Sequence, residues 1–145
     1  MYIGRVFEVS DEVFEAVMRL VPQLGLHKPI PTRDELTALV SSENSTFWIA
    51  RYPDEKGAIA GMLAVALYRV PTGMRSIVED VVVDEKMRRL GVAEALMNSA
   101  INFAREAGAN GVALTSNPQR EAANKLYQSL GFERRETNAY FYRLK

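Results

Sequence analysis

The sequence predicts an α/β fold of the α+β kind, in which a mixed, mostly antiparallel sheet of about seven strands is flanked by four helices within one domain, residues 1–145. Apolar segments at residues 46–52 and 58–70 are joined by the turn-like PDEKG and followed by the turn PTG, which is typical of an antiparallel meander. The run IVEDVVV, residues 77–83, is nearly all β-branched, as expected of a strand covered on both faces. A helical repeat separates it from the short strand GVALT, which predicts a parallel crossover.

The N-terminal part is predicted to contain one strand and two helices. Residues 2–9 alternate well enough for a first strand, and the Ser-Asp-Glu that follows supplies an N-cap and an acidic first turn for a helix over about residues 11–20. Thr32 and Glu35 form a capping box in TRDE, which predicts a second helix ending near residue 41.

The C-terminal part contains the strongest helical repeat. Apolar residues recur at three- and four-residue steps from Val92 to Ala107, and Gly108 then supplies the stop. A further helix is predicted from about Pro118 to the residue before Gly131. FERRE and AYFYRL are predicted to close the chain as a final pair of strands.

The composition restricts the chemistry open to the chain. It has no cysteine, which excludes disulfides and thiolate nucleophiles, and a single histidine, His27, which argues against a zinc site or a His-based triad. Lys plus Arg equals Asp plus Glu at 18 each, so no global charge would recruit nucleic acid or a membrane surface. The sequence shows neither a signal-peptide pattern nor an apolar run long enough to span a membrane, so we expect a cytoplasmic protein.

A basic turn and a glycine stand between the predicted central strand and the strongest helix. The turn carries Lys86, Arg88, Arg89 and Gly91. A helix N-terminus has unpaired N–H groups and about half a positive charge, and glycine lets an anion approach closely, so the pattern predicts a phosphate or pyrophosphate site. In the alternative interpretation the arginines are solvated loop charges and the glycine merely turns the chain. The sequence lacks a Walker A loop and a GxGxxG fingerprint, which argues against ATP and NAD.

The same segment resembles a known family. RRLGVA, residues 88–93, is similar to the R/Q-x-x-G-x-G/A signature of the Gcn5-related N-acetyltransferases. The resemblance extends over IVEDVVVDEKMRRLGVAEALM and LTSNPQREAANKLYQSLGFERRE, and over the order of the predicted elements. There are two departures: Leu90 stands where Gly, Lys or Arg is common, and Ala93 replaces the second glycine, a variant that the family accepts.

The resemblance implies a binding site for acetyl-coenzyme A. Backbone N–H groups would bind its pyrophosphate, Arg88 would add charge, and a β-bulge in the central strand would open the slot for the cofactor. The backbone of Val81 and Val83 would pair with the pantetheine arm, and Asn124 would hydrogen bond to it. Asn117 would act as a helix N-cap, as a cofactor partner, or as both. The pyrophosphate-binding backbone is that of Arg89, Leu90, Gly91, Val92 and Ala93.

Two side chains are candidates for catalysis. Acetyl transfer to an amine needs a base, because free alkylammonium groups have pKa values near 10. Glu79, beside an apolar run where burial would raise a carboxyl pKa, is the first candidate, and Asp80 is the reserve; strand alternation predicts that only one of them faces the cleft. Alternatively, Glu79 pairs with an arginine and anchors the strand. Tyr127 matches the residue that often protonates the departing thiolate in the family, although packing is its other interpretation.

The function implied is direct acetyl transfer from acetyl-coenzyme A to a primary amine of a small molecule or peptide. A non-catalytic acyl-coenzyme A sensor is the alternative, and a nucleotide-binding module of another family is a weaker one. By resemblance, LGLHKPIP and YRVPTGMR would flank the acceptor, although His27 is more simply a solvated loop residue. Tyr140 and Tyr142 alternate on the predicted last strand, where they would form a homodimer edge or be buried in the monomer.

Overall fold

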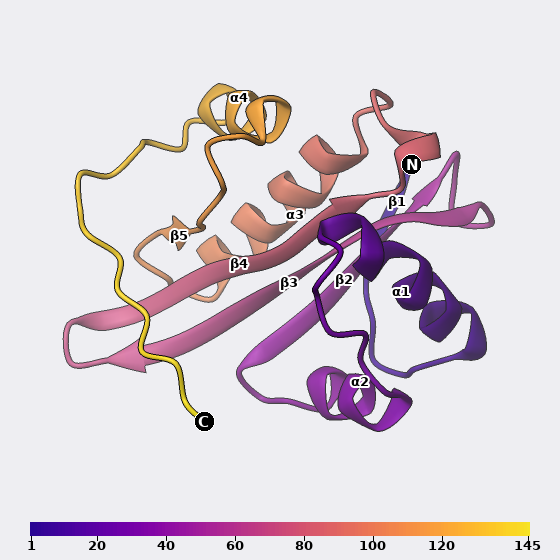
Figure 1. Cartoon of the computed structure of the whole chain (residues 1–145), viewed down its shortest axis with the longest axis horizontal. Helices are drawn as coiled ribbons and strands as arrows, with labels where there is room; N and C mark the ends of the chain where they lie inside the picture. The colour runs from indigo at the N-terminus through magenta and orange to yellow at the C-terminus, as the bar shows by residue number, and fades with distance from the viewer. The chain divides into compact units, whose positions relative to one another are not determined.

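The computed structural model describes all residues, 1–145, as two compact units, Met1–Leu114 and Thr115–Lys145. The first unit is built on one sheet of five strands in the order β1-β2-β3-β4-β5 (Figure 1). The strands are β1 (Tyr2–Arg5), β2 (Ser45–Tyr52), β3 (Ala58–Val70), β4 (Gly73–Val83) and β5 (Val112–Ala113). β1 to β4 are antiparallel neighbours, and β5 runs parallel to β4. The predicted meander and parallel crossover are both confirmed.

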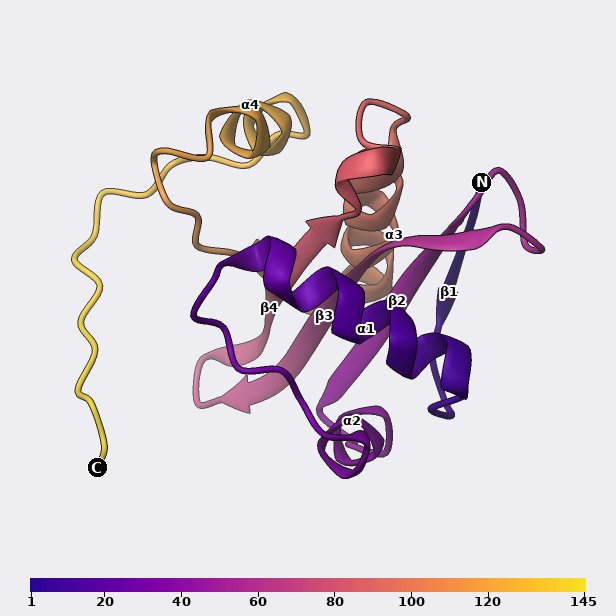
Figure 2. The same cartoon turned by 45° about the vertical axis from the view of Figure 1, so that its right-hand side comes forward.

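Helices cover both faces of this sheet. The helices α1 (Asp11–Leu24) and α2 (Arg33–Val40) lie over one face, and α3 (Val92–Glu106) lies over the other (Figure 2). The core between the sheet and the first two helices is built from apolar residues that include Val17, Leu20, Leu36, Phe47 and Met62. On the other side of the sheet, α3 buries Leu96, Met97 and Ala100 completely. The apolar faces that the helical and strand periodicity predicts therefore pack together in two apolar layers, one on each side of the sheet.

Local capping explains where the helices begin. The Ser10 side chain accepts from Val13 N–H at 3.2 Å, and Thr32 and Glu35 form the predicted capping box of α2. The first helix is longer than predicted: it passes Leu20 and Pro22 and ends at Leu24. Burial of Val21 against the core offsets the backbone hydrogen bond that Pro22 removes.

The second unit contains one helix, α4 (Glu121–Ser129). The prediction that it starts near Pro118 is wrong by about one turn, because residues 117–120 form a separate turn: the Asn117 side chain accepts from Gln119 N–H at 2.9 Å. Gly131 has φ 99°, the left-handed value typical of a glycine just after a helix, and its stop is confirmed.

The predicted final pair of strands is not found. Residues 132–145 pair with no strand, so the sheet has five strands and not about seven. Alternation in AYFYRL reflects only local preference, whereas a strand also requires a neighbour for its backbone groups. Four large apolar side chains of this segment are exposed by 83% or more: Tyr140, Phe141, Tyr142 and Leu144.

Candidate active site

The middle of β4 is irregular at its two acidic residues. Met62 of β3 lies opposite Val82, whereas Ala64 lies opposite Glu79, so β4 advances by three residues where β3 advances by two. This unequal advance is a β-bulge. Asp80 within it has φ 52°, in the left-handed region that Asp tolerates better than most residues. The bulge that the family resemblance implied is therefore present.

The bulge brings both carboxylates to one side of the sheet. Glu79 shares a face with its cross-strand partner Ala64, and Ala64 and Asp80 both line the same cavity. A regular strand would send neighbouring side chains to opposite faces, whereas the bulge places both on one side. Of the two, only Asp80 lines the cavity, so the prediction that only one of the pair faces the cleft is not contradicted. Glu79 is also exposed, contrary to its expected burial.

A cavity of about 310 Å³ lies in the first unit, beside these carboxylates. Its walls come from α1, the loop after it, α2 and strands β2 to β4. Most of the lining is apolar, and only three of the lining side chains carry charge: Lys28, Glu35 and Asp80. His27, from the same loop, is exposed and is not part of the lining.

Beyond its pairing with β5, one edge of β4 is open. β5 pairs with β4 at only two positions, so residues 78–83 have no strand neighbour on that side. Asp84 N–H donates to the Ala60 carbonyl of β3 at 2.8 Å. Because backbone groups alternate between the two edges of a strand, those of Val81 and Val83 point to the open edge. This edge can accept an extended amide-containing chain.

An uncapped helix N-terminus follows the same strand. Gly91 is the N-cap of α3, with φ 80° and no side-chain hydrogen bond, and a Cβ built on it would meet nothing within 4 Å. The first helical hydrogen bond joins Ala95 N–H to the Gly91 carbonyl at 3.1 Å, which leaves Val92, Ala93 and Glu94 N–H groups without a helical partner. Free amides at the positive end of a helix suit an anion.

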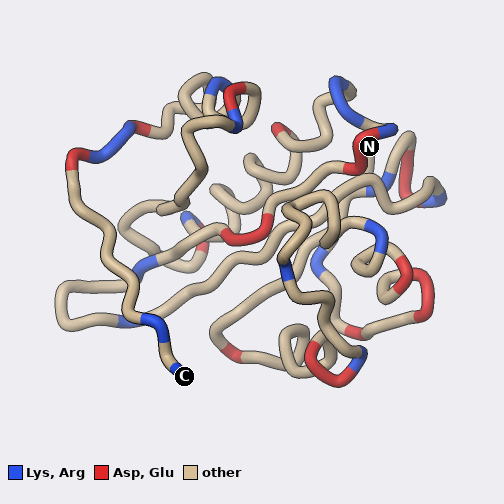
Figure 3. The backbone as a smooth tube through the Cα atoms, viewed as in Figure 1, with Lys and Arg blue, Asp and Glu red and all other residues tan.

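The turn before this helix is basic and exposed (Figure 3). Arg88 donates from Nε to the Val83 carbonyl at 3.3 Å, and its other guanidinium N–H groups make no hydrogen bond within the protein. Arg89 has φ 65° and Leu90 is exposed by 41%. The guanidinium groups of Arg88 and Arg89 and the free amides at the start of α3 thus lie on one short segment. Together these groups suit a pyrophosphate.

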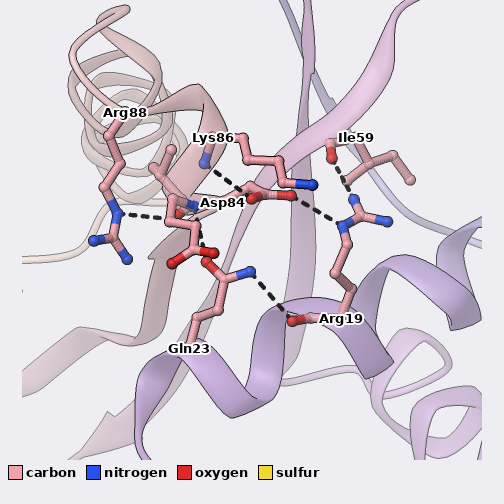
Figure 4. A network of polar contacts seen from close by, with 8 residues as sticks. Arg19, Gln23, Ile59, Asp84, Lys86 and Arg88 are labelled. Atoms are coloured by element: carbon pink, nitrogen blue, oxygen red, sulfur yellow. Dashed lines mark hydrogen bonds and ion pairs between the residues drawn. The ribbon is translucent and has the colours of Figure 1, made fainter.

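A polar network ties this turn to α1 (Figure 4). Arg19 donates to Asp84 Oδ2 at 3.0 Å and to the Ile59 carbonyl at 2.8 Å. Gln23 Oε1 accepts from Glu85 N–H at 2.8 Å. The other oxygen of Asp84 accepts from Lys86 N–H at 3.1 Å. One buried carboxylate therefore orders the start of the turn and fastens it to a helix that lines the cavity.

The Asp84 carboxylate is held in its charged form. Burial alone would raise the pKa of Asp84, but the Lys86 N–H and the Arg19 guanidinium outweigh burial and lower that pKa below its ordinary value. Asp84, Arg19 and Gln23 are not among the site residues predicted from the sequence. Asp is a common helix N-cap residue, so the position of Asp84 directly before the turn was a usable signal. Its partner Arg19, however, lies 65 positions away, and no local sequence pattern links the two.

The second unit contains the remaining predicted site residues. Asn124 donates from its side-chain nitrogen to the Asn117 carbonyl at 3.0 Å and the Arg120 carbonyl at 2.8 Å. These bonds fix the turn before α4 and leave the Asn124 side-chain oxygen free to accept. Arg120, not Asn117, is the residue that precedes α4, so the predicted helix N-cap role of Asn117 is wrong.

Tyr127 is the one buried residue of α4. It is exposed by 6%, and its ring meets Phe132 edge to face with centroids 6.0 Å apart. Burial raises the pKa of Tyr127, and the nearby Arg120 charge opposes that rise only in part. The phenol consequently keeps its proton at neutral pH, as a proton donor must.

The first unit therefore gathers most of the predicted site, namely Glu79, Asp80, Val81, Val83 and residues 88–93, around β4 and the start of α3. An open strand edge, a bulge with two carboxylates and an uncapped helix N-terminus form a combination that suits a phosphorylated acyl carrier and a nucleophile.

The family model of the Acetyltransferase (GNAT) family matches residues 11–132. The chain therefore belongs to the GNAT family of acetyltransferases, as the signature at residues 88–93 indicated. The match extends across both compact units.

The relatives that the chain matches in sequence are named N-acetyltransferases. The chain is 32% identical over 105 residues to N-acetyltransferase family 8 member 3 of Rattus norvegicus, a match that covers 71% of this chain and 44% of that protein. It is 32% identical over 103 residues to N-acetyltransferase 8 of Homo sapiens, which covers 70% of this chain and 44% of that protein. The chain thus matches less than half the length of these relatives.

Solved structures share the fold. An aminoglycoside acetyltransferase, meta-AAC0020, from an uncultured soil metagenomic sample, in complex with sisomicin, has a TM-score of 0.85 at 20% identity, covering 99% of this chain and 96% of that chain. A probable acetyltransferase has a TM-score of 0.84 at 21% identity, covering 100% and 99%. None of the helices has the length and hydropathy needed to cross a membrane.

Proposed function

We propose that the protein transfers an acetyl group from acetyl-coenzyme A directly to a primary amine of a small molecule or peptide. The observation that carries this proposal is the uncapped N-terminus of α3 at Gly91, which lies one short turn after the open edge of β4. Family membership supports the same reaction class. The absence of cysteine favours transfer without an acyl-enzyme on sulfur.

The residues present fit acetyl-coenzyme A as the donor. Backbone N–H groups from Arg89 to Ala93 would bind its pyrophosphate, and the free N–H groups of the Arg88 guanidinium would add charge. Val81 and Val83 would pair with the amides of the pantetheine arm along the open strand edge. Asn124, through its free side-chain oxygen, and Asn117 are proposed as further partners of that arm.

The donor supplies an acetyl group activated as a thioester. Glu79 would take a proton from the acceptor ammonium, directly or through water, with Asp80 as the alternative base at the same bulge. The amine nitrogen then attacks the carbonyl carbon, so that the C–N bond forms and the C–S bond breaks. Tyr127 would give the departing thiolate a proton, and solvent would then reprotonate the phenolate. The base would release its first proton to solvent and then accept the second proton from the amide nitrogen.

The test measures thiol release and identifies the acetylated amine by mass spectrometry, with acetyl-coenzyme A and a panel of amines. Glu79→Gln is expected to lower kcat/KM at least about tenfold and to remove the acidic limb of its pH profile, because proton abstraction typically contributes 10²–10⁴-fold. Asp80→Asn serves as the matched comparison at the neighbouring position. An unchanged pH profile in Glu79→Gln together with an altered one in Asp80→Asn would move the base to Asp80.

The same assay separates an enzyme from a sensor. A non-catalytic acyl-coenzyme A sensor would be thermally stabilised by acetyl-coenzyme A, because any ligand of the native state raises stability, yet it would release no thiol with any amine. The proposed enzyme shows both stabilisation and amine-dependent thiol release. Stabilisation without release across the whole panel would contradict the proposal.

A further inference from the structure

We propose that the acceptor is a monocationic primary amine with an apolar body, and that this body occupies the cavity between α1, α2 and the sheet. This inference rests on the proposed function and narrows its acceptor class. The cavity, the charges on its wall and the bulge at Asp80 support it independently of the cofactor site.

The walls of the cavity are suited to an apolar group. They are formed mainly by aliphatic and aromatic side chains, among them Val21, Leu24, Leu36, Leu39, Phe47 and Met62. The volume of about 310 Å³ lies at the lower end of the range for small-molecule sites. The loop after α1 supplies Lys28, Pro29 and Pro31 to the wall, and it also exposes Leu26 by 92% and Ile30 by 50%.

The charges on the wall are arranged for one cation. Glu35 already accepts from the Thr32 hydroxyl at 3.1 Å and from the Thr32 N–H at 3.5 Å, as part of the capping box. Asp80 takes part in no ion pair and accepts no hydrogen bond in the structure. Asp80 is therefore the free carboxylate of the cavity, and Glu79 lies beside it on the same side of the sheet. An ammonium group placed there would reach the proposed base.

The same charges disfavour a polycation. The lining has two carboxylates and one ammonium, Lys28, so its net charge is −1. A second ammonium on the acceptor would lie either among apolar side chains, where an unpaired charge is costly, or near Lys28, where it is repelled. The cavity therefore selects an amine with one positive charge.

This inference distinguishes the chain from a protein of the same fold. The aminoglycoside acetyltransferase described above was solved with sisomicin, a compound with several amino groups. At 20% identity that structure shares the fold and carries no information on the acceptor of this chain. The lining of this cavity predicts the opposite preference.

The first experiment compares kcat/KM for phenethylamine, as the apolar monoamine, with that for spermidine and for sisomicin. We expect phenethylamine to be preferred at least about tenfold, since a tenfold ratio requires less free energy than the burial of two CH₂ groups, before any cost of an unpaired buried charge is added. The variant Leu39→Asp is expected to raise KM for phenethylamine about tenfold and to leave kcat and stabilisation by acetyl-coenzyme A unchanged. Ala38→Asp is the control, because Ala38 is exposed on the same helix and does not line the cavity.

The second experiment changes the charge at the rim. Lys28→Glu shifts the lining from a net charge of −1 to −3, so we expect kcat/KM for spermidine to rise several-fold at low ionic strength and to lose this gain in 0.5 M salt. Lys56→Glu makes the same charge change at an exposed residue outside the cavity and is expected to alter nothing.

The two levels of proposal fail in different ways. If no amine of any class is acetylated although acetyl-coenzyme A stabilises the protein, the proposed function is wrong. If spermidine or sisomicin is acetylated more efficiently than phenethylamine, and Leu39→Asp behaves like Ala38→Asp, the acceptor inference is overturned while the acetyltransferase activity stands.

Discussion

Asp84 is the residue on which the geometry of the phosphate-binding turn most depends. Its two oxygens hold the Lys86 N–H on one side and Arg19 of α1 on the other (Figure 4). Charged hydrogen bonds of this kind stabilise a protein by about 1.5–3 kcal/mol each when buried, and less when one partner is half exposed, as Arg19 is.

Asp84→Asn is therefore expected to lower the free energy of unfolding by about 1–2 kcal/mol at neutral pH. Because the pKa of Asp84 is lowered in the folded state, its contribution is complete above the ordinary carboxyl value of 3.8 and is lost as the pH falls through the lower folded value. The difference in stability between variant and wild type should consequently shrink on acidification below about pH 4. Urea unfolding at pH 7, 5 and 3 measures this.

Asp54→Asn is the matched control for this experiment. Asp54 accepts from Lys56 N–H at 2.9 Å in the same i to i+2 pattern, but it is exposed and has no ion-pair partner. We expect it to change stability by less than about 0.5 kcal/mol at every pH. Equal effects of the two variants would show that the Arg19–Asp84 link contributes nothing particular.

Tyr127 is proposed to protonate the departing thiolate, and its removal should separate chemistry from binding. Tyr127→Phe keeps the ring that packs on Phe132 and removes only the hydroxyl. We expect kcat to fall at least about tenfold while the affinity for acetyl-coenzyme A stays within about twofold. Steady-state kinetics and calorimetry measure the two quantities separately. Equal kcat values for Tyr127→Phe and the wild type would show that Tyr127 only packs and does not protonate the thiolate.

For single residues, the sequence predicts a structural role where the signal lies within a few neighbouring residues. It does not predict a role that depends on a partner far away in the sequence. Ser10, the Thr32–Glu35 box, Gly91 and Gly108 follow from patterns within four residues, and all are found as predicted. The Arg19–Asp84 pair joins residues 65 positions apart, and no periodicity or capping rule connects them. The left-handed φ of Asp80 likewise depends on its pairing with β3.

Among the elements, α3 offers an internal comparison for the anion site. Gly91 begins the helix with φ 80° and Gly108 follows its end with φ 81°, and a Cβ at either position would meet nothing within 4 Å. Replacement by alanine is therefore strained to a similar degree at both ends, at about 1–2 kcal/mol, without a steric clash.

Gly91→Ala and Gly108→Ala should accordingly destabilise the protein alike but differ in cofactor binding. A methyl group at residue 91 stands where the pyrophosphate would approach, so we expect acetyl-coenzyme A to bind at least about tenfold more weakly to Gly91→Ala and normally to Gly108→Ala. Thermal unfolding and calorimetric titration provide both comparisons. Similar affinities in the two variants would mean that the start of α3 does not bind the donor.

The central strand shows why element boundaries are easier to predict than element geometry. The run IVEDVVV identified β4 as a buried central strand, but its bulge arises from a register shift against β3, which lies outside the run. The shift places Glu79 and Asp80 on one side of the sheet, where Asp80 lines the cavity. Similarly, α1 continues past Pro22 because the apolar residues beyond Leu20 pack on the core.

In the whole molecule, the order of the elements is as predicted up to residue 131, although α1 and α4 have other bounds than predicted, and the prediction is wrong beyond that residue. The order of helices and strands, the meander and the crossover were all predicted, because each depends on apolar periodicity and turn residues. The last two strands were not found, because residues 132–145 have strand-like alternation without a paired neighbour. The structure divides into two compact units, and the prediction that residues 1–145 form a single domain stays a prediction.

The central claim at this scale is that the protein captures acetyl-coenzyme A through its diphosphate. The most direct measurement is calorimetric titration of the full chain with acetyl-coenzyme A and with acetyl-pantetheine, which lacks the diphosphate and the nucleotide. We predict that acetyl-coenzyme A binds at least about a hundredfold more tightly, and that Arg88→Ala with Arg89→Ala removes much of the difference. Equal affinities for the two compounds in the wild-type protein would contradict the account.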